Sequence, residues 1–360
     1  MKKNCKLKKV KSLSSWKTEF QRVFKTLPPL YDFLGWTLPS ELEKVVKTYS
    51  LFVPYNLALK IKKAGPDSAL ARQFLPSLTE LDKSGLEDPI GDRTYSKSAQ
   101  IIHRYNSRAL FTPTTVCPVH CRYCFRKNEL NQGEDFFDPD FENTLSYLQS
   151  HTEISEIIFT GGDPFTLSDS KLAFYLNAFK DIKHIKDIRF HSRYPVIMPE
   201  RITNELVETL RSFQKHFRTI SIAVHTNHLE EFDESSNEAI KKLNVFHLLT
   251  QTVLLRGVND NSQTLFELFD HCLSLGIRPY YLHHPDQVKG GMHFYLSLED
   301  GRKIFQPLRN LLPGWALPQY IIDIPNGHGK VSAFNPESFE YSGQLIGRSG
   351  DIISSREPNS

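Results

Sequence analysis

The sequence contains few cysteines, little net charge and no long apolar run, and each of these absences excludes a class of protein. Five unevenly spaced cysteines in 360 residues are too few for the disulfide framework of a secreted protein, and they favour a reducing compartment, the cytoplasm. A net charge of +3 gives no overall reason to expect binding to nucleic acid or to a membrane surface. No apolar stretch reaches the roughly 20 residues that span a bilayer, and the basic N-terminus lacks the apolar core of a secretory signal.

What the sequence does contain is three cysteines in one short segment, Cys117, Cys121 and Cys124, with the spacing C-x3-C-x2-C. Thiols at this spacing can bind a single iron–sulfur cluster, but a four-iron cluster usually takes four cysteines. The other two, Cys5 and Cys272, are far away in the sequence, so one iron would stay open for a small ligand. The amino and carboxylate groups at the methionine end of S-adenosylmethionine suit such an iron.

The alternative for these thiols is a zinc site with His120 or a distant histidine as the fourth ligand. Zinc motifs usually pair two C-x2-C clips, and the sequence has only one, from Cys121 to Cys124. Tyr123, an aromatic residue just before the last cysteine, fits a loop that shields a cluster from water. The segment resembles the motif of the radical S-adenosylmethionine superfamily, which has an aromatic residue at that position.

The region from residue 16 to 92 reads as short helices separated by proline and glycine. Ser40 and Glu43 have the spacing of a capping box, which predicts a helix from there to Thr48. We find no pattern in this region that carries chemistry, and we expect it to form a helical cap over another part of the molecule.

From about His103 onwards, predicted strands and helices alternate, which indicates a parallel sheet. The expected strands are residues 109–116, 154–159, 188–191, 219–224, 245–255 and 277–282, and the expected helices between them are 171–179, 204–217, 238–243 and 263–275. Six βα units are fewer than the eight of a closed barrel. Radical S-adenosylmethionine proteins have such a partial (βα)6 TIM-like barrel. We therefore expect an α/β fold in three parts: a helical region and linker (1–102), the barrel (103–315) and a C-terminal segment with a polar tail (316–360).

Polar residues follow several predicted strands, at the edge where α/β proteins bind their ligands. The cysteine loop follows the first strand, and Gly161, Gly162, Asp163 and Pro164 follow the second. The glycines would let the backbone approach a ligand closely, and the Asp163 carboxylate could accept a hydrogen bond from an ammonium group. In the superfamily that this chain resembles, this turn contacts the methionine amino group of the cofactor.

The C-terminal region has a hydrophobic strand followed by a glycine-bearing loop that ends in Lys330. A lysine on such a loop can hold an aldehyde cofactor as a Schiff base. The segment, DIPNGHGK, resembles the pyridoxal phosphate motif of the lysine 2,3-aminomutase family. The resemblance extends from about His103 to Phe334 through the segments CRYCFR, GGDP, HSR-x-P, QTVLLRGVND, PYYLHHPD and DIPNGHGK.

The resemblance implies a role for individual residues of this chain. Lys330 would carry pyridoxal phosphate, Arg104 and Arg108 would hold its phosphate region, and His225 and Gln251 would contact S-adenosylmethionine. Arg126 would bind the carboxylate of the substrate. Asp286 and Asp323 would bracket the distal ammonium of lysine, since a cation taken out of water needs an anionic partner. Two aspartates favour lysine over glutamate, whose own carboxylate they would repel.

The function that the resemblance implies is that of an isomerase, a lysine 2,3-aminomutase that converts L-lysine to β-lysine. It would need an electron donor such as a flavodoxin or ferredoxin. The compact form resembles bacterial enzymes that make β-lysine for elongation factor P. No cysteine follows Cys272, so the zinc site of longer relatives and their mode of oligomerisation stay open, although a homo-oligomer is possible. The alternatives are the same chemistry on glutamate or arginine, or a zinc-binding protein without catalysis.

Overall fold

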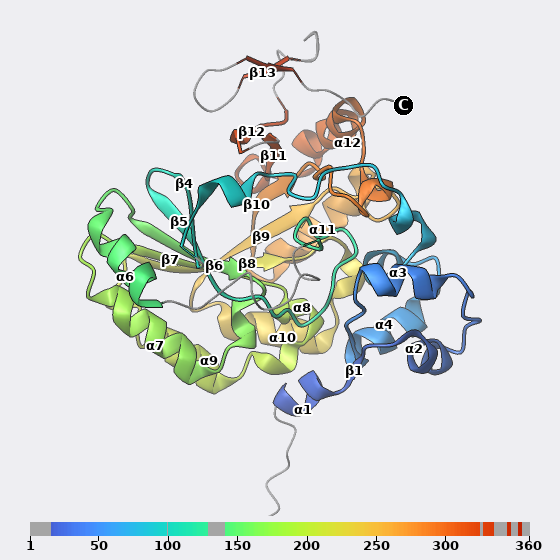
Figure 1. Cartoon of the computed structure of the whole chain (residues 1–360), viewed down its shortest axis with the longest axis horizontal. Helices are drawn as coiled ribbons and strands as arrows, with labels where there is room; N and C mark the ends of the chain where they lie inside the picture. Colours follow the sequence, from blue (N-terminus) through green and yellow to red (C-terminus); the bar gives the residue numbers. More distant parts are fainter. Residues whose placement is uncertain are drawn as a thin grey trace, which may run out of the picture.

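Strands and helices alternate through most of the chain in the computed structural model (Figure 1). The structure describes residues 16–98, 100–128, 141–324, 327–334, 344–346 and 352–354. The α-helices are α1 (Trp16–Gln21), α2 (Leu27–Leu34), α3 (Leu42–Thr48), α4 (Tyr55–Ala64), α5 (Ala69–Phe74), α6 (Phe141–Ser150), α7 (Asp169–Lys180), α8 (Tyr194–Ile197), α9 (Asn204–Arg211), α10 (Glu234–Leu243), α11 (Ser262–Ser274) and α12 (Leu298–Leu311). The 3-10 helices are η1 (Leu78–Leu81), η2 (Asp92–Tyr95), η4 (Pro164–Thr166), η5 (Pro199–Arg201), η6 (Leu229–Glu231), η7 (Met292–Phe294) and η8 (Gly314–Ala316).

The main sheet has ten strands in the order β12-β11-β10-β9-β8-β7-β6-β5-β4-β3. They are β3 (Ser96–Ser98), β4 (Ile101–Tyr105), β5 (Arg108–Thr114), β6 (Glu156–Gly161), β7 (Asp187–Ser192), β8 (Thr219–His225), β9 (His247–Val253), β10 (Arg278–His283), β11 (Gln319–Ile324) and β12 (Gly329–Ser332). Neighbours from β5 to β11 pair in parallel, and the outer strands β3, β4 and β12 pair antiparallel. Two separate two-stranded sheets pair β1 (Val23–Phe24) with β2 (Val53–Pro54) and β13 (Gln344–Ile346) with β14 (Ile352–Ser354), both antiparallel.

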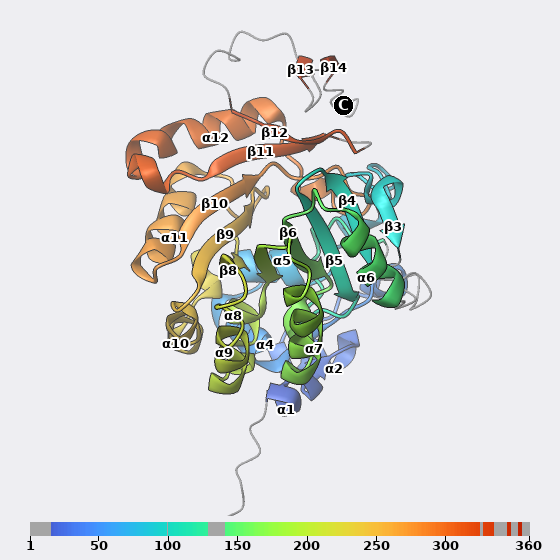
Figure 2. The same ribbon diagram turned by 90° about the vertical axis from the view of Figure 1, so that its left-hand side faces the viewer.

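The predicted α/β fold with six βα units is confirmed, because parallel neighbours need a crossover between them. Helices α6, α7, α9, α10, α11 and α12 provide these six crossovers and cover the outside of the curved sheet (Figure 2). Strand β11 adds a seventh parallel strand. Five crossover helices begin where a side chain accepts a hydrogen bond from a backbone N–H group of the first turn, at Ser168, Thr203, Asp233, Asn261 and Ser297.

The prediction of a capping box at Ser40 is wrong, although the helix that it predicted is present as α3. A backbone hydrogen bond of 3.2 Å from Leu42 to Pro39 closes a turn at this point. Glu41, the residue before α3, already has helical dihedral angles, and no side chain caps the helix. The helix therefore grows out of a turn, and Ser40 is not its N-cap residue.

The N-terminal helices share a core with the sheet. One apolar cluster includes Leu27 of α2, Phe74 of α5, Phe159 of β6 and Ala333 after β12. A boundary between residues 102 and 103 would cut β4, and one between 315 and 316 would cut η8. The division into three parts therefore stays a prediction. The predicted tail lies mostly outside the described residues.

None of the helices in the described ranges combines the length and the apolar character that crossing a membrane requires.

Candidate active site

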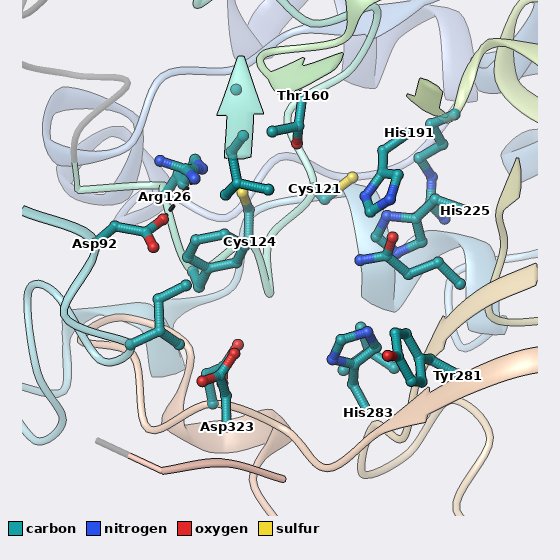
Figure 3. Close-up of a pocket in the computed structure, with 18 of the residues that line it drawn as sticks. Asp92, Cys121, Cys124, Arg126, Thr160, His191, His225, Tyr281, His283 and Asp323 are labelled. Atoms are coloured by element: carbon teal, nitrogen blue, oxygen red, sulfur yellow. Dashed lines mark hydrogen bonds and ion pairs between the residues drawn. The ribbon is translucent and has the colours of Figure 1, made fainter. Parts of the chain in front are cut away.

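The carboxyl ends of the parallel strands open into one large cavity, whose volume is about 1820 Å³ when its open mouth is included (Figure 3). All the predicted site residues line this cavity except Pro164, which begins η4. They are Cys117, Cys121, Cys124, Gly161, Gly162, Asp163, His225, Gln251, Arg104, Arg108, Arg126, Asp286, Asp323 and Lys330. The fold thus gathers residues from both ends of the barrel sequence around one space.

The three cysteines of the loop are free thiols that are partly enclosed. Burial raises the pKa of the Cys124 thiol to about 11, and the neighbouring Cys121 raises it further. Burial also raises the pKa values of Cys117 and Cys121. Burial outweighs the nearby positive charges of Arg193 at Cys121 and of Arg126 and Lys127 at Cys124, so these thiols are protonated, whereas a bound iron would hold them as thiolates. In the described ranges, no three His, Cys, Asp or Glu side chains converge closely enough to hold a single metal ion.

A buried ion-pair network holds the cysteine loop from the N-terminal side. The carboxylate of Glu80 in η1 accepts hydrogen bonds from Nε of Arg122 at 3.0 Å and from Nζ of Lys127 at 2.9 Å. The backbone N–H of Arg122 donates to the carbonyl of Gln73 at 2.8 Å. The N-terminal region therefore holds the cysteine loop in place through a buried network of charges. The sequence around Glu80 does not predict these ion pairs, because Arg122 and Lys127 belong to a loop that is distant in the sequence.

The GGDP turn is locked onto the cysteine loop by backbone contacts. The N–H of Gly162 donates to Thr114 at 2.7 Å, and that of Asp163 donates to Val116 at 2.9 Å. A Cβ atom at Gly162 would lie 2.5 Å from the carbonyl oxygen of Val116. Glycine is needed here because two backbone segments approach each other closely.

The carboxylate of Asp163 is largely satisfied by the protein itself. It accepts hydrogen bonds from the N–H groups of Arg193 at 2.6 Å and Phe165 at 3.0 Å, and from the hydroxyl of Ser192 at 3.1 Å. Burial raises its pKa to about 6, and these hydrogen bonds oppose the rise. Since a carboxylate has about four acceptor positions, at most one is left for a ligand. The predicted contact with an ammonium group stays a prediction.

His225, at the end of β8, belongs to a cluster around Tyr123. The hydroxyl of Tyr123 lies 3.0 Å from Nε2 of His225 and also contacts the guanidinium of Arg193. Burial, followed by the charge of Arg193, lowers the pKa of His225 well below its usual value, so the imidazole is neutral. Gln251 is the register partner of His225 on β9. Their predicted contacts with S-adenosylmethionine stay predictions.

Lys330, on β12, points its amine at a carboxylate. Its Nζ forms an ion pair with Asp323 on the adjacent strand β11, and its backbone N–H donates to the hydroxyl of Tyr105 at 2.7 Å. Burial opposes the charge of the amine, but Asp323, Tyr105 and Asp286 together outweigh this effect and raise the pKa of Lys330. Residues 325 and 326 of the predicted cofactor motif lie outside the described residues.

Arg104 lies between two carboxylates. Its guanidinium donates to Asp323 at 3.0 Å and to Asp92 at 2.7 Å. The predicted contact of Arg104 with a phosphate group stays a prediction, and these pairs make Arg108 the more accessible of the two arginines. Arg108 places its guanidinium 3.9 Å from the centre of the Tyr105 ring.

Asp92 is a site residue that sequence reasoning missed. The first residue of η2, it binds both Arg104 and Arg126, the latter at 2.5 Å, and it is almost fully buried. Figure 3 shows Asp92 and Arg126 together on one side of the cavity. Asp92 lies in a segment without hydrophobic periodicity, so the sequence could not predict that its side chain enters the cavity and binds these arginines.

Asp286 completes an acidic pair with Asp323. Burial raises the pKa of Asp286 to about 7, and the negative charge of Asp323 raises it further, while Lys330 lowers it. Because the charge of Asp323 disfavours ionisation of the buried Asp286 carboxyl group, a cation bound between the two would be stabilised.

Comparisons with known proteins agree with this arrangement. A family model described as the radical SAM superfamily matches residues 111–269. A putative L-lysine 2,3-aminomutase of Aquifex aeolicus is 34% identical over 326 residues, covering 88% of this chain and 87% of that protein. The L-lysine 2,3-aminomutase of Escherichia coli is 38% identical over 285 residues, covering 77% and 81%, and that of Haemophilus influenzae is 36% identical over 289 residues, covering 79% and 85%. The chain therefore belongs to the lysine 2,3-aminomutase family of radical S-adenosylmethionine proteins.

Proposed function

We propose that this protein is a lysine 2,3-aminomutase, an isomerase that moves the α-amino group of L-lysine to C3 and forms β-lysine. One observation carries the proposal. Three cysteines, a lysine with an enclosed amine and a pair of aspartates line the same cavity, although they come from separate parts of the sequence. Membership of the family implies a four-iron cluster, S-adenosylmethionine and pyridoxal phosphate as cofactors.

The cysteine loop fits an iron–sulfur cluster better than a zinc ion. A zinc ion holds its sulfur ligands at about 2.3 Å, so its ligands must converge, and no such group of three is found among the described residues. A four-iron cluster places a cage of iron and sulfide between its thiolates and needs a wider arrangement. The C-x3-C-x2-C spacing and the match of residues 111–269 to the radical SAM superfamily support Cys117, Cys121 and Cys124 as cluster ligands.

The wall around Lys330 fits pyridoxal phosphate. The amine faces the cavity, and the Asp323 carboxylate beside it can take up a proton when the amine reacts with an aldehyde. When bound, the cluster with S-adenosylmethionine supplies one-electron chemistry that removes hydrogen from a carbon atom, and pyridoxal phosphate supplies the π-system through which nitrogen migrates. The protein positions the substrate and limits the access of water.

The charges of the cavity support a substrate with a carboxylate at one end and an ammonium group at the other. Arg126, which Asp92 holds in place, would bind the carboxylate. Asp286 and Asp323 would bind the distal ammonium, which removes their mutual repulsion. Glutamate would bring a third carboxylate next to Asp286 and Asp323, which would repel it. Arginine would bring a cation larger than the ammonium group of lysine.

The experiment that tests the proposal is anaerobic reconstitution with iron, sulfide, S-adenosylmethionine, pyridoxal phosphate and a reductant, followed by incubation with L-lysine. We expect β-lysine from the wild type and none from Lys330→Ala. Parallel incubations with glutamate and arginine test the alternative substrates. Turnover of either in preference to lysine, or a zinc-loaded protein without iron and sulfide, would overturn the proposal.

We further propose that a flavodoxin or ferredoxin donates the electron, that the enzyme works in the cytoplasm, where free thiols persist, and that its product serves elongation factor P. Sedimentation of the reconstituted enzyme tests whether it forms a homo-oligomer.

A further inference from the structure

Two histidines that have no role so far, His191 at the end of β7 and His283 at the end of β10, face the cavity (Figure 3). The Nε2 atom of each is buried, and neither atom has a hydrogen-bond partner among the described residues. Buried polar nitrogens in native proteins almost always have a partner. Two such atoms on one wall of the cavity therefore leave two nitrogens available to a ligand.

The charges around this wall are positive. Burial and the charge of Lys330 lower the pKa values of both imidazoles well below the usual value, and Arg189 lowers that of His191 as well. His283 packs edge-on against Tyr281, with 5.4 Å between the ring centres. Burial raises the pKa of Tyr281, while Arg189 and Arg108 oppose this rise, so both arginines are close to its hydroxyl.

The acidic groups that line the cavity near this wall have partners of their own, since Asp323 pairs with Lys330 and Arg104, and Asp163 accepts hydrogen bonds from Ser192 and Arg193. Figure 3 shows the two histidines with Tyr281 on one side, and Asp92 with Arg126 on the opposite side. Arg189 pairs with Glu156 at 3.1 Å, and Glu156 is not among the residues that line the cavity. Arg108 lines the cavity and has no ion pair to any described residue. A neutral imidazole in a positive environment is a hydrogen-bond donor suited to an anion.

We propose that His191 and His283, together with Arg108, bind the phosphate group of pyridoxal phosphate. The inference rests on the proposed function, which puts the aldehyde of this cofactor on Lys330. The cofactor carries its aldehyde and its phosphate arm on adjacent ring atoms, so the phosphate must lie near that amine. Lys330 is close enough to act on both imidazoles, whereas Arg104 is occupied by Asp92 and Asp323.

The test compares two aldehydes, pyridoxal phosphate and pyridoxal, which lacks the phosphate. Each is titrated into cofactor-free protein, trapped on Lys330 with borohydride and quantified by mass spectrometry. We expect His191→Ala and His283→Ala each to weaken the binding of pyridoxal phosphate by about tenfold or more, because each removes a hydrogen bond to a charged group. The binding of pyridoxal should not change. The variants His191→Gln and His283→Gln keep a donor and should recover part of the loss, and His216→Ala, at an exposed position, is the control.

An equal loss for both aldehydes would mean that the histidines only support packing, and an unchanged preference for the phosphate would mean that they do not bind it. Either result overturns the inference. A second arm does not depend on Lys330. Inorganic phosphate should raise the melting temperature of the cofactor-free wild type and leave that of the double variant unchanged. If neither aldehyde labels the wild type, the proposed function fails. The melting experiment with inorganic phosphate then decides by itself whether this wall binds anions.

Discussion

At the scale of single residues, the carboxyl group of Asp286 has an unusual property, since its pKa of about 7 lies far above that of a free aspartate. Burial is the main cause, and the nearby charge of Asp323 adds to it. A carboxyl group with this pKa changes its charge close to neutral pH, where the enzyme would work. The binding of a cationic substrate at this position should therefore depend on pH.

We predict that the KM for lysine rises as the pH falls through 7, because Asp286 then becomes protonated and loses its attraction for the ammonium group. The variant Asp286→Asn should raise KM by about a hundredfold, the cost of removing one partner of an enclosed charge pair, and its KM should no longer change near pH 7. Steady-state kinetics across neutral pH measures both effects. Asp270→Asn, on the exposed side of α11, is the control, and a flat pH profile of the wild type would contradict the prediction.

Asp92 is a positioning residue in our interpretation, because Arg126 and Arg104 both donate hydrogen bonds to its carboxylate. We predict that Asp92→Asn raises KM for lysine more than it lowers kcat, and that Asp92→Glu, which keeps the charge, recovers part of the loss. Both variants should also melt at a lower temperature, since a buried arginine loses a well-placed partner. An unchanged KM in Asp92→Asn would show that Arg126 does not need this carboxylate.

At the scale of elements, the GGDP turn and the cysteine loop act as one unit, because their backbones are hydrogen-bonded and in direct contact. We predict that Gly162→Ala displaces the cysteine loop and lowers the iron content after reconstitution. The loss of stability should be about 1–3 kcal/mol, the usual cost of overpacking. Iron and sulfide analysis together with urea unfolding measures these effects.

The matched control is Gly314→Ala, because a Cβ atom at Gly314 would have no neighbour within 4 Å. It should bind iron like the wild type. Equal iron content in both variants would mean that the turn does not position the cysteines.

At the scale of the whole molecule, the N-terminal helices are joined to the barrel through the buried carboxylate of Glu80. Burial by itself would raise the pKa of Glu80, but Arg122 and Lys127 outweigh this effect and lower it. A carboxyl group whose pKa is lower in the folded state stabilises the fold above its unfolded pKa, about 4.3. This contribution is lost as the pH falls through the folded value.

We predict that Glu80→Gln destabilises the protein by about 3–5 kcal/mol at neutral pH, because it leaves two buried cations without their shared anion. The difference from the wild type should shrink under acidic conditions, where the wild-type carboxyl group is protonated. Urea unfolding at neutral and acidic pH measures this. Glu41→Gln, which removes an exposed pair with Lys44, should leave the melting temperature unchanged, and a similar small effect of Glu80→Gln would contradict the proposed role of the network.

The sequence identified those parts of the site that are local in the chain. The spacing of Cys117, Cys121 and Cys124 is fixed by one loop, and the apolar strands set which residues follow each strand end. Because the ends of parallel strands meet at one edge, the meeting of GGDP, His225, Gln251 and Asp286 around one cavity followed from their positions along the chain.

Other features depend on which distant residues the fold brings together. Asp92 and Glu80 lie in segments without periodicity, and their importance comes only from the arginines and lysine that pack against them. Whether Arg104 is available to a ligand, and whether His191 and His283 lack partners, is likewise a matter of packing.

The sequence by itself determined the alternation of strands and helices, the cysteine loop and the position of Lys330, because hydrophobic periodicity and short motifs are properties of neighbouring residues. Only the tertiary structure decided which charges pair and which stay available, and thus which pKa values shift. The physical reason is that charge pairing and desolvation act through space, between side chains that no local pattern connects.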